Sequence, residues 1–491
     1  MSFAFRQEKR IPYILAGITL AGICFYTYAS FFYFRIGFPL DDAWIHQTYA
    51  RSFAQTGRWE FFSGQVSGGG STSPLWSFLL VPGHLFGINL YVWTFFLGAL
   101  ALWGTSILAE WAVRRIVSGY QSKIPWVGIL FCFEWHLVWA AVSGMETSLY
   151  IFLITLFFVL LIITPRNTLV LGLIVGASIW VRPDGMTLLF PLFLTVLLTT
   201  STNQEKFKNI LKIGLGFCLL TLPYLLFNYA VSGSVMPNTF YAKQTEYAAL
   251  QSIPIYQRFI EQSIQPITGV GIVVLPVMLL GIYNAIHDRN WALISSFVWL
   301  LTFTGLYAIR LPVTYQHGRY EMPVIPIFLL LGSIAGAEWL AKPVPKGINR
   351  ILRTSWILSC GLICAAFFAL GAWTYAKDVA FIDSAMVDTA VWVAENLPSS
   401  DLIAAHDIGA LGYFGSHRLL DLAGLISPDV IQTMRDQSGL AHFLDMKGAN
   451  YLVSFPSWYP ELIIGKKEIY SSNSKFVQSY GGENMVVYRW K

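Results

Sequence analysis

The chain has 491 residues, of which 55% are hydrophobic and only 12% are charged, against roughly 25% charged in an ordinary soluble domain. This composition, with a mean hydropathy of +0.56, excludes a purely soluble enzyme, a disordered chain and a nucleic-acid-binding protein. All five cysteines lie in apolar runs, where neither a metal site nor an extracytoplasmic disulfide would be built. We interpret Cys360 and Cys364, one helical turn apart, as packing residues.

Membrane-spanning helices are the first predicted elements. Crossing a bilayer takes about 20 mostly apolar residues in a helix, because the hydrocarbon core holds no water to satisfy a free backbone group. About eleven segments qualify, several of them short enough to be tilted or kinked. They lie at residues 12–34, 89–113, 125–142, 147–164, 168–181, 186–200, 210–230, 268–286, 291–309, 324–341 and 352–375.

The basic residues predict the orientation of these helices. The loops on the side of the N-terminus hold 15 Lys and Arg in 53 residues, whereas the opposite loops within residues 35–323 hold 8 in 101. The positive-inside rule therefore places the N-terminus in the cytoplasm and the large polar loops outside. The first helix follows Arg6, Lys9 and Arg10 without a small-residue cleavage site, which predicts an anchor in a multi-pass plasma-membrane protein.

Residues 35–88 are predicted to form a structured outer loop. The apolar run 74–86 is too short to span, and counting it as a span would put Arg114 and Arg115 outside. We expect it to form a helix in the outer membrane interface.

The last part of the chain has a different composition. Residues 376–491 hold 13 of the 27 acidic residues and 9 of the 32 basic ones. Alternating apolar patterns predict strands at 402–406, 419–422, 449–455 and 485–490, and helical patterns lie at 378–397, 429–436 and 440–446. The sequence thus predicts a transmembrane domain over 1–375 and a soluble extracytoplasmic α/β domain over 376–491.

Two adjacent carboxylates, Asp41 and Asp42, lie at the outer end of the first helix. Neighbours on a helix point about 100° apart, so one can face a reacting hydroxyl while the other takes a cation, a metal or helix N-terminal amides. His46, four or five residues further on, lies near the same helical face as this acidic pair. The alternative is a simple helix cap at a membrane exit.

Other polar groups gather at the predicted outer ends of the spans. Their common side predicts one extracytoplasmic cavity, although Arg182 could instead pair with Asp184, and Arg319 with Glu321, as loop ion pairs of little energetic value. The candidate residues are Glu146, Arg182, Asp184, Asn238, Tyr241, Lys243, Arg319 and Tyr320.

The cations in this set suit a phosphate ligand, because Arg offers a planar fork and Lys a point charge. No nucleotide-binding glycine motif is present, and nucleotide sugars are not ordinarily supplied outside the cytoplasm. The phosphate is therefore expected on a lipid. Glu134 and His136, near the middle of the third span, are a second functional hypothesis; a protonated Glu bonded to a neighbouring helix is an equal alternative.

Short motifs in this order resemble the GT-C superfamily of glycosyltransferases, with closest similarity to the branch of mycobacterial terminal arabinofuranosyltransferases. The resemblance covers most of the chain. It rests on the acidic pair with its helix at 41–51 and on the segments 71–76, 144–147, 182–185, 237–243, 319–326, 407–413 and 421–425.

The resemblance implies an integral-membrane enzyme that passes a sugar from a polyprenyl phosphate to an acceptor hydroxyl on the outer side, with inversion. Asp41 and Asp42 are then the catalytic candidates. Arg182, Lys243 and Arg319 are candidates for the donor phosphate. The other substrate-binding candidates are His46, Glu146, Asp184, Asn238, Tyr241 and Tyr320.

The partners implied are a lipid-linked sugar donor and a glycan, lipid or protein acceptor. No tightly bound cofactor is expected, and a divalent metal stays an open alternative. Related chains often carry an acidic residue where this chain has Ser67. We therefore do not carry over the acceptor or the metal requirement of those chains to this one. The competing function is a transporter or flippase of lipid-linked sugars, which would be expected to place polar groups along a path through the bilayer.

Overall fold

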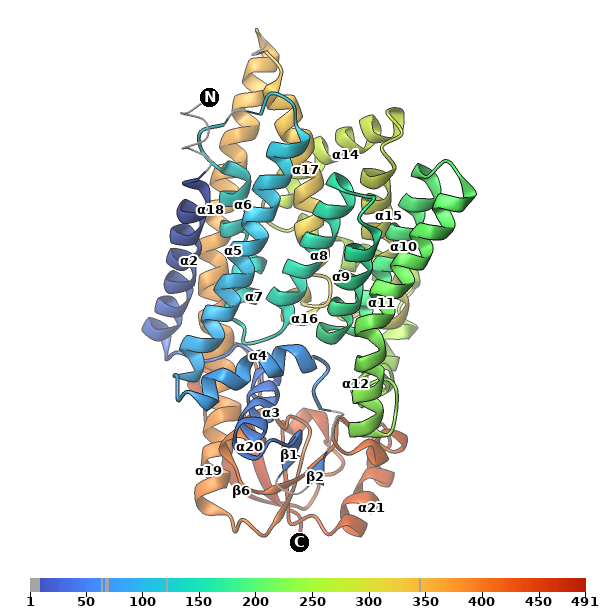
Figure 1. Ribbon diagram of the computed structural model, residues 1–491. Helices are drawn as coiled ribbons and strands as arrows, with labels where there is room; N and C mark the ends of the chain where they lie inside the picture. The colour runs from blue at the N-terminus through green and yellow to red at the C-terminus, as the bar shows by residue number, and fades with distance from the viewer. Residues whose placement is uncertain (1–8, 63–64, 67–69, 121, 344–345) are drawn as a thin grey trace.

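The computed structural model of the protein describes all residues except 1–8, 63–64, 67–69, 121 and 344–345. A bundle of long helices fills one end of the molecule, and a small sheet from the last part of the chain lies at the other (Figure 1). Between them lie α3 (Asp42–Thr56) and α4 (Pro74–Leu85). The segment after the first helix is therefore in a position to contact both parts.

All eleven predicted segments fall on helices. Among the described residues, six helices are long and apolar enough to cross a membrane, or seven if the bent pair Ile255–Ile267 and Gly271–His287 is one span. The number of spans thus stays a prediction. The helices of the bundle are α2 (Ile11–Tyr33), α5 (Leu90–Ile116), α6 (Trp126–Phe133), α7 (Trp135–Val142), α8 (Thr147–Ile163), α9 (Thr168–Val181), α10 (Leu189–Thr199), α11 (Asn203–Ser232), α14 (Gly271–His287), α15 (Trp291–Arg310), α17 (Val324–Ala341) and α18 (Ile348–Ile382).

The third predicted span is broken in its middle, between α6 and α7. Glu134 takes an extended conformation there, with ψ of 119°. Its carboxylate accepts a hydrogen bond from the Leu137 backbone N–H at 2.9 Å and contacts His136 Nδ1 at 2.8 Å. Glu134 is therefore the N-cap of α7, and His136 contacts its carboxylate, so both residues have a local structural role.

The C-terminal sheet has the strand order β4-β3-β5-β7-β6. Its first three strands, β3 (Leu402–Ala405), β4 (Arg418–Asp421) and β5 (Tyr451–Ser454), are parallel, and β7 (Val486–Arg489) and β6 (Lys467–Ser471) add antiparallel pairs. The four predicted strands are confirmed. β6 was missed because it is an edge strand with no buried residue, and it contains two charged residues.

The predicted boundary at residue 376 falls inside a continuous helix. α18 runs on through the π-helical turn Asp383–Val387 into α19 (Asp388–Asn396). Arg35, just after α2, holds this turn through Asp383 at 2.7 Å and Asp388 at 2.9 Å. A continuous helical segment therefore joins the bundle to the sheet, and the domain division stays a prediction.

A close contact between α5 and α7 fixes the path to the site. A Cβ at Gly98 would run into the backbone carbonyl of Ala141, near the end of α7. The chain then turns at Gly144, whose φ of +77° favours glycine, and reaches Glu146. The absence of a side chain at Gly98 thus lets α5 approach the end of α7 closely, and this contact fixes the position of the turn that follows.

We predict that Gly98→Ala lowers the free energy of unfolding by about 1–3 kcal/mol, because the new methyl group overpacks a backbone contact. The matched control is Gly17→Ala on α2, where a Cβ would meet no atom within 4 Å. Thermal unfolding of both variants in detergent checks this. An equal effect of the two substitutions would contradict the role of Gly98.

Candidate active site

Two cavities meet at the start of α3. The first, of about 430 Å³, is lined by α3, η1 (Pro183–Leu188), α12 (Asn238–Glu246) and the end of α15. The second, of about 1090 Å³, lies between the bundle and the C-terminal sheet. The side chains that line both are Asp42, Ile45, Lys243, Arg319 and Leu425. A carboxylate therefore stands where the two spaces join.

The neighbouring aspartates have separate partners, as their helical offset predicted. Asp41 accepts hydrogen bonds from the backbone N–H groups of Gly409 and Ala410 at 2.7 and 2.8 Å, at the start of α20 (Gly409–Phe414). Asp42 pairs with Arg319 at 2.6 Å. Asp41 thus ties α3 to the C-terminal part, and Asp42 faces the cavities.

The two carboxylates differ in pKa for a physical reason. Burial raises the pKa of Asp41 to about 6, against the two amides that lower it. Burial would raise the pKa of Asp42 too, but the charges of Arg319 and Lys243 hold it well below its ordinary value. Asp42 is therefore the more firmly ionised of the pair.

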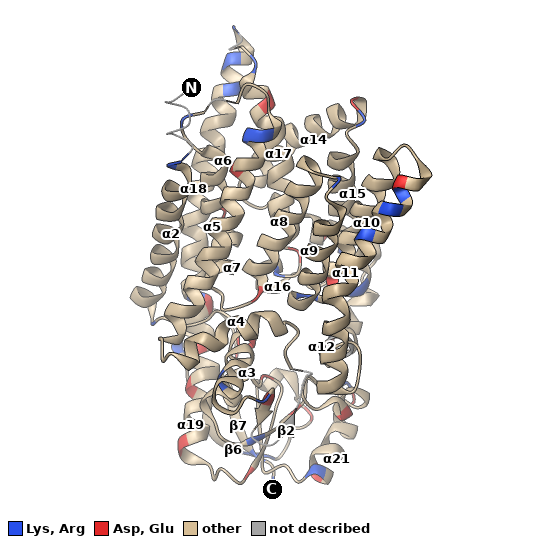
Figure 2. Ribbon diagram, in the orientation of Figure 1, with Lys and Arg blue, Asp and Glu red and all other residues tan. Residues whose placement is uncertain are grey.

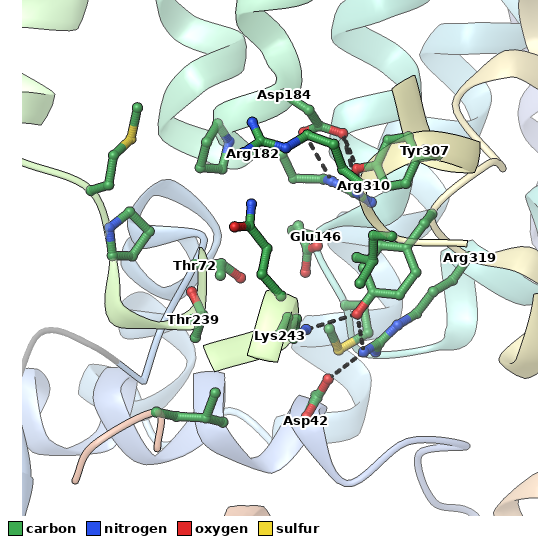
Figure 3. Close-up of a pocket in the computed structure, with 18 of the residues that line it drawn as sticks. Asp42, Thr72, Glu146, Arg182, Asp184, Thr239, Lys243, Tyr307, Arg310 and Arg319 are labelled. Carbon is green, nitrogen blue, oxygen red and sulfur yellow. Dashed lines mark hydrogen bonds and ion pairs between the residues drawn. The ribbon is translucent and has the colours of Figure 1, made fainter. Parts of the chain in front are cut away.

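Arg182, Lys243 and Arg319 line the first cavity (Figure 3), and all three lie near the ring of Tyr320. The charged groups of Arg182, Lys243 and Arg319 lie 5.4, 5.2 and 5.0 Å from its ring centroid. Lys243 Nζ and Arg319 Nη2 also donate hydrogen bonds to its hydroxyl, at 2.8 and 3.1 Å. Tyr320 therefore helps to hold these charges together without neutralising them.

Arg319 has guanidinium N–H donors that the described residues leave unused. Its Nε and Nη1 are buried and have no hydrogen-bond partner among the described residues. The predicted alternative pairing of Arg319 with Glu321 is wrong, since Arg319 pairs with Asp42 and Glu321 accepts from Thr304 at 3.1 Å. An anion in the cavity would satisfy the unused guanidinium donors.

Arg182 and Asp184 do pair, at 3.2 Å, as the loop alternative proposed. The pair is not an isolated surface bridge, because Tyr307 on α15 accepts from Arg182 at 2.7 Å and donates to Asp184 at 2.5 Å. Both members line the first cavity. This network fixes Arg182 against the cavity wall.

His46 and Glu146 form a second polar group on this wall. His46 Nε2 lies 3.4 Å from the Glu146 carboxylate, and its Nδ1 lies 2.9 Å from Ser77 Oγ. The turn that carries Glu146 is held by Trp76, which donates to the Gly144 carbonyl at 2.9 Å. α3 and α4 thereby position Glu146.

Most of the site residues predicted from the sequence line one of the two cavities. Asn238 lines neither cavity, and its helix presents Thr239 to the first cavity instead. The side chain of Tyr241 lies outside the described part of the structure. Those that line the first cavity are Asp42, His46, Glu146, Arg182, Asp184, Lys243, Arg319 and Tyr320, and Asp41 lines the second.

Sequence reasoning missed several lining residues. Arg310 is a further cation in the first cavity, and its place at the end of an apolar helix was a usable signal. His406 and Asp407 line the second cavity directly after β3, where the end of a parallel strand marks ligand sites. Among the described residues, no group of three or more His, Cys, Asp or Glu side chains is placed to hold a metal ion.

Comparison with solved structures identifies the fold. Crystal structures of ArnT from Cupriavidus metallidurans, in the apo state and bound to undecaprenyl phosphate, match with TM-scores of 0.60 and 0.59 at 13% identity. They cover 97% and 96% of this chain and 98% and 97% of ArnT. The Archaeoglobus fulgidus oligosaccharyltransferase matches with a TM-score of 0.62 at 11% identity, over 91% of this chain and 69% of that one. The chain thus has a fold similar to that of ArnT and of the oligosaccharyltransferase.

The narrower branch stays a prediction. The arabinofuranosyltransferase AftD from Mycobacteria matches with a TM-score of only 0.49 at 16% identity, over 98% of this chain and 40% of that one. The family described as "Domain of unknown function (DUF8728)" matches residues 378–488. No curated protein matches the sequence.

We predict that stability falls as pH rises from about 5 to about 8. Burial raises the pKa of Asp407 to about 8, with Asp41 and Asp42 adding to the rise. The folded state therefore binds more protons than the unfolded state in this range, so the free energy of unfolding falls as pH rises. We expect the fall that accompanies ionisation of Asp407 to reach about 1–3 kcal/mol. Thermal unfolding against pH checks this. Asp407→Asn should flatten the slope, whereas the exposed Asp429→Asn should not, and an unchanged slope in Asp407→Asn would refute the assignment.

Proposed function

We propose that the protein is an integral-membrane glycosyltransferase that moves a sugar from a polyprenyl phosphate to an acceptor hydroxyl. The observation that supports this most strongly is the position of Asp42 at the junction of a cationic cavity and an acidic, aromatic one. A carboxylate there can reach a donor on one side and an acceptor on the other. The resemblance of the sequence motifs to GT-C enzymes and the likeness of the fold to ArnT support this chemistry.

The first cavity suits a lipid-borne phosphate. Arg182, Lys243, Arg310 and Arg319 line it together with apolar side chains such as Met186 and Leu306. Cations can hold the phosphate and neutralise the charge that develops on it as it leaves, and the apolar wall can take the first prenyl units. That ArnT binds undecaprenyl phosphate on the same fold supports a donor of this class.

In the proposed reaction the acceptor oxygen attacks C1 of the sugar. A new C1–O bond forms while the bond between C1 and the phosphate oxygen breaks in line, so the configuration inverts. Asp42 takes the acceptor's proton, and the polyprenyl phosphate leaves as an anion held by Arg319 and Lys243. Positioning and leaving-group electrostatics supply most of the acceleration.

Donor binding should prepare Asp42 for this task. A carboxylate with a strongly lowered pKa is a weak base, and the low pKa of Asp42 comes from Arg319 and Lys243. A phosphate that competes for these two cations would raise the pKa of Asp42, since it both removes positive charge and adds negative charge nearby. The base would thus be strengthened only when the donor is in place.

The proposed orientation places the site outside the cytoplasm. Lys and Arg gather at the end of the bundle remote from the C-terminal sheet (Figure 2), which supports a cytoplasmic N-terminus by the positive-inside rule. With about eleven spans, the cavities and an extracytoplasmic α/β domain over 376–491 then share the outer side. A plasma-membrane location follows from the same proposal.

We predict that Asp42→Asn slows transfer by about 10²–10⁴-fold, the usual contribution of a general base. Polyprenyl-phosphate binding should be unchanged or tighter, because Arg319 loses its competing carboxylate. The measurement is transfer or hydrolysis of purified polyprenyl-phosphate sugars by mass spectrometry, with Asp429→Asn as the control. Near-wild-type transfer by Asp42→Asn would overturn the catalytic assignment, and movement of lipid-linked sugar without any transfer by the wild type would favour the transporter.

A further inference from the structure

The C-terminal wall of the second cavity is the carboxyl edge of the parallel strands. His406 and Asp407 follow β3, Ala423 and Leu425 follow β4, and the segment 457–459 follows β5, and all of them line the cavity. In open α/β sheets, ligands bind outside the carboxyl ends of the strands. The sheet therefore presents the edge that such folds use for recognition.

Asp407 brings unused hydrogen-bonding capacity to this edge. Its Oδ2 is buried and has no partner among the described residues. The neighbouring His406 is already engaged, since its Nδ1 lies 2.8 Å from the Tyr459 hydroxyl and its Nε2 lies 3.5 Å from Glu246 on α12. A buried polar atom left unpaired is costly, and a ligand hydroxyl would satisfy it.

An aromatic surface lies beside Asp407. Trp458 is 43% exposed and lines the cavity, and its ring centroid is 4.8 Å from His406 and 5.0 Å from Phe455. These two rings hold the indole in place while part of it stays uncovered. A fixed, uncovered indole in a polar cavity is suited to the apolar face of a sugar ring.

The charge of this cavity favours a neutral ligand over an anionic one. Among the described residues that line the second cavity and not the first, the only Lys or Arg is Arg435. The carboxylates in the same set are Asp41, Glu246, Asp378, Asp407 and Glu483. The carboxylates of Glu246, Asp378 and Glu483 would repel an anionic acceptor. A polyol could instead donate hydroxyl hydrogen bonds to carboxyl oxygens, including that of Asp407, whose raised pKa leaves it largely uncharged near neutral pH.

We propose that this edge is an acceptor subsite for a neutral carbohydrate, with a sugar ring on Trp458 and one of its hydroxyls bonded to Asp407 Oδ2. A second hydroxyl of the acceptor then points toward Asp42. This inference rests on the proposed function. Asp407 is a positioning residue, and the C-terminal sheet recognises the acceptor instead of only bracing the bundle.

The test compares acceptor and donor kinetics in the full-length protein. Trp458→Ala and Asp407→Asn should each raise the KM for a neutral oligosaccharide acceptor by about tenfold, the loss of one good contact. The donor KM and the hydrolysis of donor by water should change less than about twofold. The matched controls are Trp392→Ala, in the same domain but lining neither cavity, and Asp429→Asn. Equal changes in both KM values, or transfer only to anionic acceptors, would overturn the subsite.

A binding measurement separates this inference from the proposed function. Tryptophan fluorescence of the wild-type protein is titrated with neutral trisaccharides of glucose, mannose and arabinose, and the titration is repeated with Trp458→Phe, Asp407→Asn and Trp392→Ala. Binding that Asp407→Asn weakens and Trp392→Ala does not would support the subsite even if no transfer were found. Active transfer with saccharide binding unaffected by Asp407→Asn and Trp458→Phe would refute the subsite and leave the function standing.

Discussion

The ion pair between Asp42 and Arg319 is the interaction on which the site is built. Arg319 lies in a cluster with the buried Arg182 and Tyr320 and the half-buried Lys243, and like charges taken out of water need a nearby counter-charge. Asp42 supplies part of it and thereby brings the start of α3 to the mouth of the bundle. The same pair leaves two guanidinium nitrogens of Arg319 unused, so the cluster is held together and is still able to take an anion.

The second aspartate connects this cluster to the rest of the chain. Asp41 accepts hydrogen bonds from two backbone N–H groups of α20, and the adjacent Asp42 pairs with Arg319 of the bundle. The start of α3 is therefore bonded to both parts of the molecule. α12 makes a similar link, because Lys243 lies in the cationic cluster and Glu246 reaches His406 after β3. These contacts place one carboxylate between two cavities, which are the proposed donor and acceptor sites.

Several features of the site could be predicted from local sequence. The 100° offset of adjacent helical residues gave Asp41 and Asp42 different partners, and the gathering of polar motifs at one set of span ends gave the residues of the first cavity. The predicted pairing of Arg319 with Glu321 was wrong because sequence proximity does not measure distance once a chain turns. Arg310 and Asp407 carry local signals, the end of an apolar helix and the end of a strand, but each becomes part of a cavity only through elements far away in the chain.

The sequence by itself determined the membrane class, the helical segments and four of the five strands of the C-terminal sheet, because hydrophobic periodicity and span length are local properties that each segment carries alone. Tertiary structure alone decided which cation meets which carboxylate, how α18 continues into the last domain, and that the strand edge bearing Asp407 faces Asp42. Those outcomes depend on contacts between residues hundreds of positions apart, where packing and the cost of unpaired buried charge select one arrangement that no single segment specifies.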